Sequence, residues 1–322
     1  MKIACLADTH LSSPELESDS LFPKQMHALR KMHASRLYDE IRSGIDRSFT
    51  LATRLLRSRS YPLLVHLGDL TGGYMEYGMA HPSTRALAIT AKQTLTACTQ
   101  KLRFCAGNLD LGYASGLGSD VSWRSIEAWR SDVDELFWFE EVNHLLMIGI
   151  CSTLANYQGT DARIRRLADD QTTFVAATLT AYPAHDWLLF AHSPWLGRPL
   201  LRVIEHRMPD LQTFAFGDLH NPRFGNLLRA AARFTTPLTA NTPGSTLKTQ
   251  LRCLRKSVMV PSLAPLWWRG HAFLEMQLHA GSVDAEQRHL SIDQSWTHAP
   301  GAHFWECLWW MLRPRRRPAR WT

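Results

Sequence analysis

Short apolar segments, each followed at once by Asp, Asn or His, recur along this chain and constrain its fold more than any other feature. The first covers residues 2–7 and is followed by Asp8 and His10. Later segments lead to Asp69, Asn108, His192 and the pair Asp218 and His220. Segments of this length and composition predict buried strands. Because residues i and i+2 of an extended chain point to the same side, Asp8 and His10 can bind one ion together.

Longer segments with the periodicity of amphipathic helices lie between these strands. We expect helices over residues 24–59, 83–101, 123–136 and 160–182. After the first strand, we expect strands over residues 63–67, 102–106, 144–151, 187–191, 213–216, 273–278 and 288–292. The last two alternate like a pair of strands joined by a Gly-Ser turn. Alternating strands and helices are typical of an α/β fold with parallel strands.

The composition is that of a globular protein. The chain has 322 residues, of which 45% are hydrophobic and 20% charged, which are ordinary values for such proteins. The sequence has no apolar run as long as a membrane-spanning helix, and its first residues do not resemble a signal peptide. The six cysteines are scattered and form no C-x-x-C pair. This usage favours a reducing, cytoplasmic location.

The net charge of +7 is concentrated in two segments. Residues 313–322 contain five arginines and no acid, and residues 221–256 contain seven basic residues and no acid. The simplest interpretation of the second segment is a solvated surface. Arg223 lies three residues after His220, close enough for its guanidinium to reach a phosphate group bound there. It is therefore a candidate ligand of a substrate phosphate.

The residues that follow the strands are the kinds that bind divalent metals. In open α/β sheets the carboxyl ends of the strands form the ligand-binding edge, so we expect these side chains to converge. Together they offer more donors than one ion uses, and they suit two ions roughly 3.5–4 Å apart that share a bridging carboxylate. Carboxylate and imidazole without thiolate favour Mn, Fe, Mg or Zn, with Mn preferred, over a structural cysteine site. The candidate ligands are Asp8, His10, Asp69, Asn108, His192, Asp218 and His220. His66 lies within its strand, where we expect a core histidine and not a ligand.

The order of these motifs resembles the calcineurin-like metallophosphoesterase superfamily. The motifs are Asp-x-His, Gly-Asp, Gly-Asn-x-Asp, a lone His after a strand, and Gly-x-x-His. The similarity covers residues 1 to about 250, and residues 241–245 resemble the Asn-Pro-Gly-Ser stretch that often follows. It implies a two-sheet α/β sandwich flanked by helices, with the metals at the carboxyl ends of the strands. It also implies that Asp8, His10 and His220 hold one metal, that Asp69 bridges, and that Asn108, His192 and Asp218 hold the other.

Two positions depart from the pattern of that superfamily. Most members have a His, which protonates the leaving group, where this chain has Leu109, and another His where it has Asp218. Leucine cannot donate a proton, so we expect leaving groups that are already stable anions. Asp218 is a competent oxygen ligand and gives the second site a harder, Mg-like or Mn-like character. The departures therefore favour a phosphodiesterase or pyrophosphatase over a phosphomonoesterase.

The function expected from the sequence is metal-dependent hydrolysis of a phosphodiester or diphosphate bond. By the resemblance, Asn108 contacts both metal and phosphate while Asp110 orients its neighbours, and the substrate is a nucleotide, a diphosphate or a phosphodiester. One alternative is a catalytically degenerate member of the fold that binds a metal or a protein partner. Another is a nuclease that uses the two basic segments to bind nucleic acid.

We expect one metallophosphoesterase domain over residues 1–295 and an aromatic and Arg-rich appendage over residues 296–322. If residues 304–312 are helical, one apolar face carries Trp305, Leu308, Trp309 and Leu312. Tryptophans followed by arginines suit an anionic membrane surface, so we expect a cytoplasmic protein that is peripheral to the inner membrane surface. A docked terminal helix is the alternative, and the same arginines would also suit nucleic acid.

Overall fold

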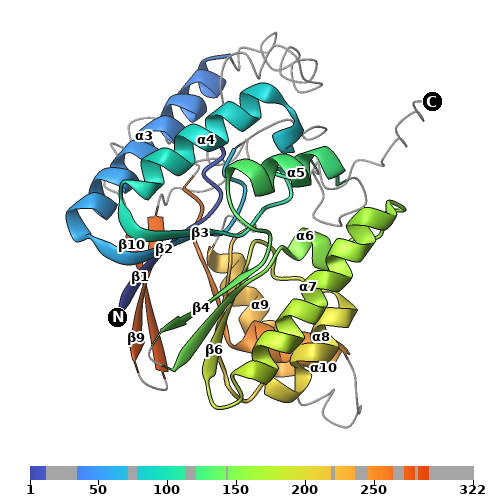
Figure 1. Ribbon diagram of the computed structural model, residues 1–322. Coiled ribbons are helices and arrows are strands. Elements are labelled where there is room, and N and C mark those ends of the chain that lie inside the picture. Colours follow the sequence, from blue (N-terminus) through green and yellow to red (C-terminus); the bar gives the residue numbers. More distant parts are fainter. Residues whose placement is uncertain are drawn as a thin grey trace.

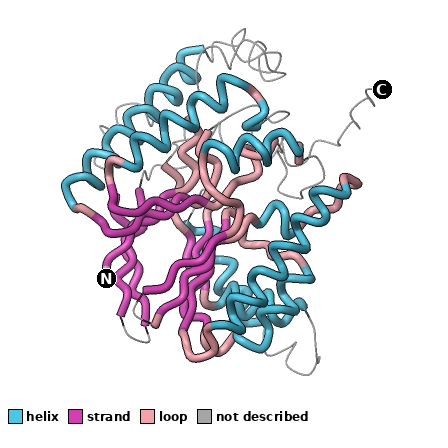
Figure 2. Tube along the Cα trace, viewed as in Figure 1, coloured by secondary structure: helices cyan, strands magenta, loops and turns pink. Residues whose placement is uncertain are grey.

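The structure is a computed structural model in which two five-stranded sheets pack face to face with helices on their outer sides (Figures 1 and 2). It describes residues 1–11, 35–71, 78–112, 121–142, 144–218, 222–235, 246–263, 272–279 and 282–289. The predicted class, an α/β sandwich of two sheets flanked by helices, is confirmed. Residues 241–245 and the predicted appendage over residues 296–322 lie outside the described part of the chain.

The first sheet has the strand order β10-β9-β1-β2-β3. Its strands are β1 (Lys2–Leu6), β2 (Tyr61–His66), β3 (Thr99–Phe104), β9 (Ala272–His279) and β10 (Ser282–His289). β1, β2 and β3 are parallel, whereas β9 is antiparallel to both β1 and β10. α3 (Ser35–Arg59) and α4 (Pro82–Thr96) are the crossover helices of this parallel part, and they lie together on its outer side in Figure 1.

The second sheet has the order β4-β5-β6-β7-β8. Its strands are β4 (Trp138–Val142), β5 (Leu145–Gly149), β6 (Asp186–Ala191), β7 (Leu211–Phe216) and β8 (Ser257–Met259). Only the β4–β5 pair is antiparallel. The remaining helices are α5 (Trp123–Asp132), α6 (Ser152–Ala155), α7 (Ala162–Ala181), α8 (Arg198–Ile204), α9 (Pro222–Thr235) and α10 (Thr246–Arg255), with the 3₁₀ turns η1 (Gly78–Ala80) and η2 (Glu205–Arg207). In Figure 1, α7, α8 and α10 cover the outer side of this sheet.

The parallel strands β1, β2, β5 and β6 are largely apolar because both of their faces are buried, whereas the edge strand β3 carries the exposed residues Gln100 and Lys101. Ile3, Cys5 and Val65 from the first sheet pack against Met147 and Phe190 from the second in the core between the sheets. The alternate side chains of the same strands point to the outer face of each sheet, where they form a further core with the covering helices. The strands are therefore held on both sides, and their carboxyl ends are rigidly placed.

Two helix boundaries differ from those expected from the sequence. α4 ends at Thr96, and Thr99–Phe104 forms β3, although we expected a helix to Lys101. α5 ends at Asp132, so most of the acidic block at 132–141 lies in the following loop and in β4, which we did not expect. Asp134 explains this, because its Oδ2 accepts the N–H of Phe104 at 3.0 Å and fixes the loop to β3. The short strand β8 was likewise not expected.

The other expected elements are present within a few residues of their predicted bounds, with one exception. β10 covers Ser282–His289 and shares only its last two residues with the strand expected over residues 288–292, and the described part of α3 begins at Ser35. The described cysteines are all buried and free. Over the described ranges, none of the helices combines the length and the apolar character that crossing a membrane requires.

Candidate metal centre

The loops that follow the strands of both sheets meet at one place. The loop after β1 pairs with the loop after β2, with the N–H of Asp8 donating to Gly68 O at 3.0 Å and that of His10 to Asp69 O at 3.0 Å. The loops after β6 and β7 are joined by the N–H of Gly217, which donates to His192 O at 2.9 Å. The predicted convergence of the strand ends is therefore present, and it includes strands of both sheets.

Two glycines allow the loops to approach closely enough for this. Gly68 has a φ of +88°, and a Cβ there would lie 2.6 Å from Gly107 Cα and 2.8 Å from His192 Nδ1. A Cβ on Gly107 would lie only 2.2 Å from Asp69 Oδ1. Neither position can take a side chain without displacing a candidate ligand. The Gly-Asp and Gly-Asn pairs in the sequence therefore have a steric cause.

Four candidate ligands have an unusual backbone conformation. Positive φ occurs in six non-glycine residues of the described chain, and four of these are Asp8 (52°), His10 (48°), Asp69 (50°) and Asp218 (63°). This region disfavours L-residues, and such residues cluster at functional sites, where the surrounding structure holds them in place. The left-handed turns direct the side chains away from the strand direction and toward one another.

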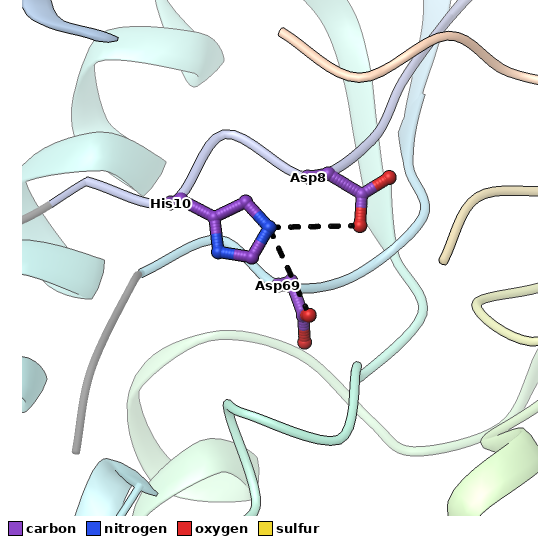
Figure 3. Close-up of side chains that lie close together, drawn as sticks. All are labelled: Asp8, His10 and Asp69. Carbon is purple, nitrogen blue, oxygen red and sulfur yellow. Dashed lines mark ion pairs between the residues drawn. The ribbon is translucent and has the colours of Figure 1, made fainter. Parts of the chain in front are cut away.

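Asp8, His10 and Asp69 form the first group of donors (Figure 3). One ligand atom from each residue lies within 4.8 Å of the others. His10 Nε2 lies 3.8 Å from Asp8 Oδ1 and 4.0 Å from Asp69 Oδ2, and all three residues are buried. Metal–ligand bonds of about 2.1 Å place neighbouring donors roughly 3–4 Å apart, so this group fits a divalent cation.

His192 is the centre of the second group. Its Nδ1 lies 2.7 Å from Leu67 O, and because a carbonyl can only accept, Nδ1 carries a hydrogen. In the neutral ring the lone pair is then on Nε2, which lies 2.9 Å from Asn108 Oδ1, 3.5 Å from Asp69 Oδ2 and 3.7 Å from Asp218 Oδ1. A backbone carbonyl that fixes the tautomer and the direction of a histidine ring is a common feature of metal sites.

Asp69 belongs to both groups. Its Oδ1 accepts the N–H of Leu109 at 2.9 Å. Its Oδ2 faces His10 on one side and His192 on the other, at 4.0 Å and 3.5 Å from their Nε2 atoms. One carboxylate oxygen therefore lies between the two groups of donors, which is the position that a bridging ligand requires.

Asp110 accepts hydrogen bonds from the backbone of two of these loops. It is fully buried, and its Oδ1 accepts the N–H of Leu70 at 3.0 Å while its Oδ2 accepts that of Gly107 at 2.9 Å. These contacts fix the loops after β2 and β3 relative to each other on either side of Asp69. The side chain next to it in the sequence, Leu109, is half-buried and carries no polar group.

The centre concentrates negative charge in a buried place. Burial raises the pKa of Asp8 well above its usual range and that of Asp69 to about 7. Burial alone would lower the pKa of His192, but the carboxylates of Asp69, Asp218 and Asp8 outweigh it and raise the pKa to about 9. Cations bound among these groups would neutralise the carboxylates and keep them ionised.

The structure places most of the predicted site residues at this centre. Those that it brings together are Asp8, His10, Asp69, Asn108, Asp110, His192 and Asp218. His220 lies outside the described residues, as does the side chain of Arg223, whose backbone belongs to α9. Sequence reasoning did not identify Thr9 or the carbonyl of Leu67 as supports, because their contacts are made across loops.

Comparisons with known proteins show similarity of structure but not of sequence. The sequence matches no protein-family model and no curated protein. Among solved structures, the chain is similar to a purple acid phosphatase from yellow lupin (Lupinus luteus) seeds, with a TM-score of 0.44, 11% identity and coverage of 90% of this chain and 52% of that one. It is also similar to GAP50, the anchor in the inner membrane complex of Plasmodium, with a TM-score of 0.37, 9% identity and coverage of 67% and 65%.

The chain thus spans about half the length of the first of these structures and less than two thirds of the second. Both TM-scores lie below 0.5, and neither similarity assigns a function to this chain.

Proposed function

We propose that this chain is a metal-dependent phosphohydrolase of the calcineurin-like type with a dinuclear centre. One observation carries the proposal: a single oxygen of Asp69 lies within 4.0 Å of donors of two groups, whose members are buried apart from the half-buried Asp218. In these groups, Asp8, His10, Asp69 and Asp218 all hold the left-handed backbone conformation. Such strain at four converging polar residues is characteristic of a binding site rather than of a core.

Each residue has a distinct role in this proposal. Asp8 and His10 hold one ion together with His220, and Asn108, His192 and Asp218 hold the other, with Asp69 shared between them. When bound, the two divalent ions, Mn or else Fe, Mg or Zn, supply Lewis-acid stabilisation of the phosphate and a water of lowered pKa. Asn108 directs its Oδ1 into the second group, and its amide N–H can donate to a phosphate oxygen. Arg223 is the proposed partner of the substrate phosphate.

Leu109 supports a preference for phosphodiesters and diphosphates. The backbone N–H of Leu109 holds the bridging carboxylate, but its side chain cannot protonate a leaving group. Leaving groups that depart as stable anions, such as a nucleotide or a phosphate, need no such proton. Leu109→His should then raise the hydrolysis of alkyl phosphomonoesters relative to diesters.

The test is metal analysis together with turnover of bis-p-nitrophenyl phosphate and an alkyl phosphomonoester in the presence of Mn²⁺. The unmodified chain should bind two ions and hydrolyse the diester faster. Asp69→Asn should lose both ions and activity, whereas the same change at the exposed Asp284 should leave both intact. Two bound ions without turnover of any phosphate ester would favour the catalytically degenerate alternative. Full activity of Asp69→Asn would contradict the site.

A nuclease is the second candidate, favoured by the acid-free segment at 221–256 that follows β7. On this alternative, single-stranded or duplex DNA should compete with the small diester in a salt-dependent way. Competition that persists at high salt, or none at low salt, would contradict it.

A further inference from the structure

Thr9 stands between two candidate ligands but takes part in a different set of contacts. Its Oγ1 lies 2.6 Å from Leu70 O and 3.2 Å from His66 Nε2. The other ring nitrogen, His66 Nδ1, lies 3.2 Å from the backbone nitrogen of Gly68. Thr9 and His66 are almost completely buried. Two side chains thus connect the loop after β1 with the loop after β2.

The direction of each hydrogen bond follows from the groups involved. The N–H of Gly68 can only donate, so Nδ1 of His66 accepts and the ring hydrogen is on Nε2. The carbonyl of Leu70 can only accept, so the Thr9 hydroxyl donates to it. The lone pair of Thr9 Oγ1 then accepts from His66 Nε2–H. The Thr9 hydroxyl also lies 3.5 Å from Asp69 O, and the neutral His66 ring satisfies these hydrogen bonds without any charge.

We infer that His66 and Thr9 are positioning residues that set the angle between the Asp8–His10 pair and Asp69. Their contacts fall on Gly68 and Leu70, which flank Asp69 in the chain, and on the carbonyl of Asp69 itself, which lies 3.5 Å from Thr9 Oγ1; Thr9 is in turn flanked by Asp8 and His10. The inference rests on the metal centre proposed above, and it assigns a function to a strand histidine that is not a ligand.

The backbone of the two loops explains why such positioning is needed. Asp8, His10 and Asp69 all have positive φ, a conformation that the backbone leaves unless surrounding contacts hold it. The backbone hydrogen bonds between the loops keep them adjacent, since Asp8 N–H donates to Gly68 O and Leu11 N–H to Leu70 O. Loss of the His66–Thr9 contacts should therefore misplace the ligands without separating the loops or unfolding the chain.

The first experiment is calorimetric titration of the full chain with Mn²⁺. Thr9→Val removes the hydroxyl and keeps the shape, and it should weaken Mn²⁺ binding by about 10–100-fold, as loss of an outer contact typically does. Thr9→Ser keeps the hydroxyl and should restore most of the affinity. Thr178→Val is the matched control in the last turn of α7, where the same substitution of a buried threonine should leave Mn²⁺ affinity unchanged.

The second experiment separates the two members of the pair. His66→Leu should weaken Mn²⁺ binding to the same extent as Thr9→Val, and His66→Gln, which can place an amide N–H near the position of Nε2, should weaken it less. The double variant His66→Leu/Thr9→Val should be no worse than either single variant, because the residues act as one unit. Additive losses would overturn the inference.

These readouts distinguish the inference from the proposed function. If Thr9→Val binds Mn²⁺ as tightly as the unmodified chain while Asp69→Asn does not bind, the positioning role is overturned and the metal centre stands. If the unmodified chain is folded and binds none of Mn²⁺, Fe²⁺, Mg²⁺ and Zn²⁺, both are overturned. If it binds Mn²⁺ but hydrolyses no ester, the proposed activity is overturned, and the affinities still decide the roles of Thr9 and His66.

Discussion

Buried carboxylates lie near both ends of the parallel strands β1 and β2, one of them on the adjacent strand β9, and the surroundings of the two carboxylates differ in charge. Near the amino ends, Glu275 of the neighbouring strand β9 is surrounded by cations. Lys2 Nζ lies 3.1 Å and Arg288 Nη2 2.9 Å from its Oε1, and Arg59 Nη1 lies 3.0 Å from its Oε2, which also accepts the hydroxyl of Tyr61. At the carboxyl ends, the described neighbours of Asp69 are His10, His192 and further carboxylates.

The two regions shift carboxylate pKa values in opposite directions. Burial raises the pKa of Glu275, but hydrogen bonds from Arg288, Tyr61 and Lys2 outweigh it and lower the pKa to about 2. Burial raises the pKa of Asp69 to about 7, because His192 offsets only part of it and Asp110 adds to it. One carboxylate is stabilised by cations of its own chain, whereas the other keeps a raised pKa that a cation bound beside it would lower. The comparison separates a structural ion cluster from the candidate metal centre at the opposite end of the sheet.

The largest expected effect that distinguishes the two regions comes from Gly107→Ala. The new Cβ would lie 2.2 Å from Asp69 Oδ1 and must displace the shared carboxylate. Because misplacing reacting groups by about 1 Å costs roughly 100-fold in rate, hydrolysis in the presence of Mn²⁺ should fall at least that far.

Gly149→Ala is the control for that substitution. A Cβ there would be equally crowded, at 2.1 Å from Trp138 Cε2, but it meets no candidate ligand. It should lower the free energy of unfolding and leave Mn²⁺ affinity unchanged. Normal activity of Gly107→Ala would show that the tight approach of the two loops is not needed.

The second prediction concerns the response of each region to metal. Mn²⁺ at 100 times its Kd should raise the free energy of unfolding by about 2.7 kcal/mol for each bound ion, because it binds the folded state alone. Glu275→Gln should show the same increase, and Asp69→Asn should show none. Denaturant titrations with Mn²⁺ and with EDTA measure all three. An equal response of Asp69→Asn would place the metal elsewhere.

The sequence was most informative about the ligand positions, because each can be recognised from one strand and the residues directly after it. Asp8 and His192 follow an apolar run directly, and Asp69, Asn108 and Asp218 follow one after a single glycine. Parallel strands must bring such residues to one edge. Their convergence could therefore be predicted without knowing the strand order. The face-to-face pairing of the two sheets came from the resemblance and not from any local pattern.

Features that depend on long-range pairing could not be predicted. The partners of Glu275 are separated from it by 13 to 273 positions, and no periodicity connects them. The Thr9–His66 contact joins two loops that are adjacent only after β1 and β2 pair. β4 was not predicted because its two glutamates interrupt the apolar pattern of a strand. One of them, Glu140, accepts a hydrogen bond from Arg103, which lies on β3 of the other sheet.

The third prediction is a loss of stability in Glu275→Gln without a loss of function. Removing the charge leaves Lys2, Arg59 and Arg288 facing one another. Breaking a fully buried pair costs about 3–5 kcal/mol, and because these cations are partly exposed we expect about 2 kcal/mol. Urea unfolding of the EDTA-treated chain measures it, and Glu135→Gln, at an exposed glutamate that pairs with Arg130 outside this cluster, is the control.

This effect should depend on pH in a defined direction. The pKa of Glu275 falls from an ordinary value of 4.5 to about 2 on folding, so the charged form stabilises the folded state above pH 4.5. The stabilisation is lost as the pH falls from 4.5 toward 2. The difference in stability between the unmodified chain and Glu275→Gln should shrink over that range and stay constant between pH 5 and 7. A difference that grows on acidification would contradict the assignment.

The smallest expected effect is that of Tyr61→Phe, which removes one neutral hydrogen-bond donor from the group of cations and donors around Glu275. The hydroxyl of Tyr61 donates to Glu275 Oε2, and Arg59 still donates to the same oxygen after the substitution. Since each oxygen of the Glu275 carboxylate keeps a hydrogen-bond partner, the free energy of unfolding should fall by about 1 kcal/mol. Tyr182→Phe, which makes the same change against the core of the second sheet, is the control. If Tyr61→Phe lost as much stability as Glu275→Gln, the hydroxyl rather than the cations would balance this carboxylate, and the contrast with Asp69 would rest on hydrogen bonding instead of charge.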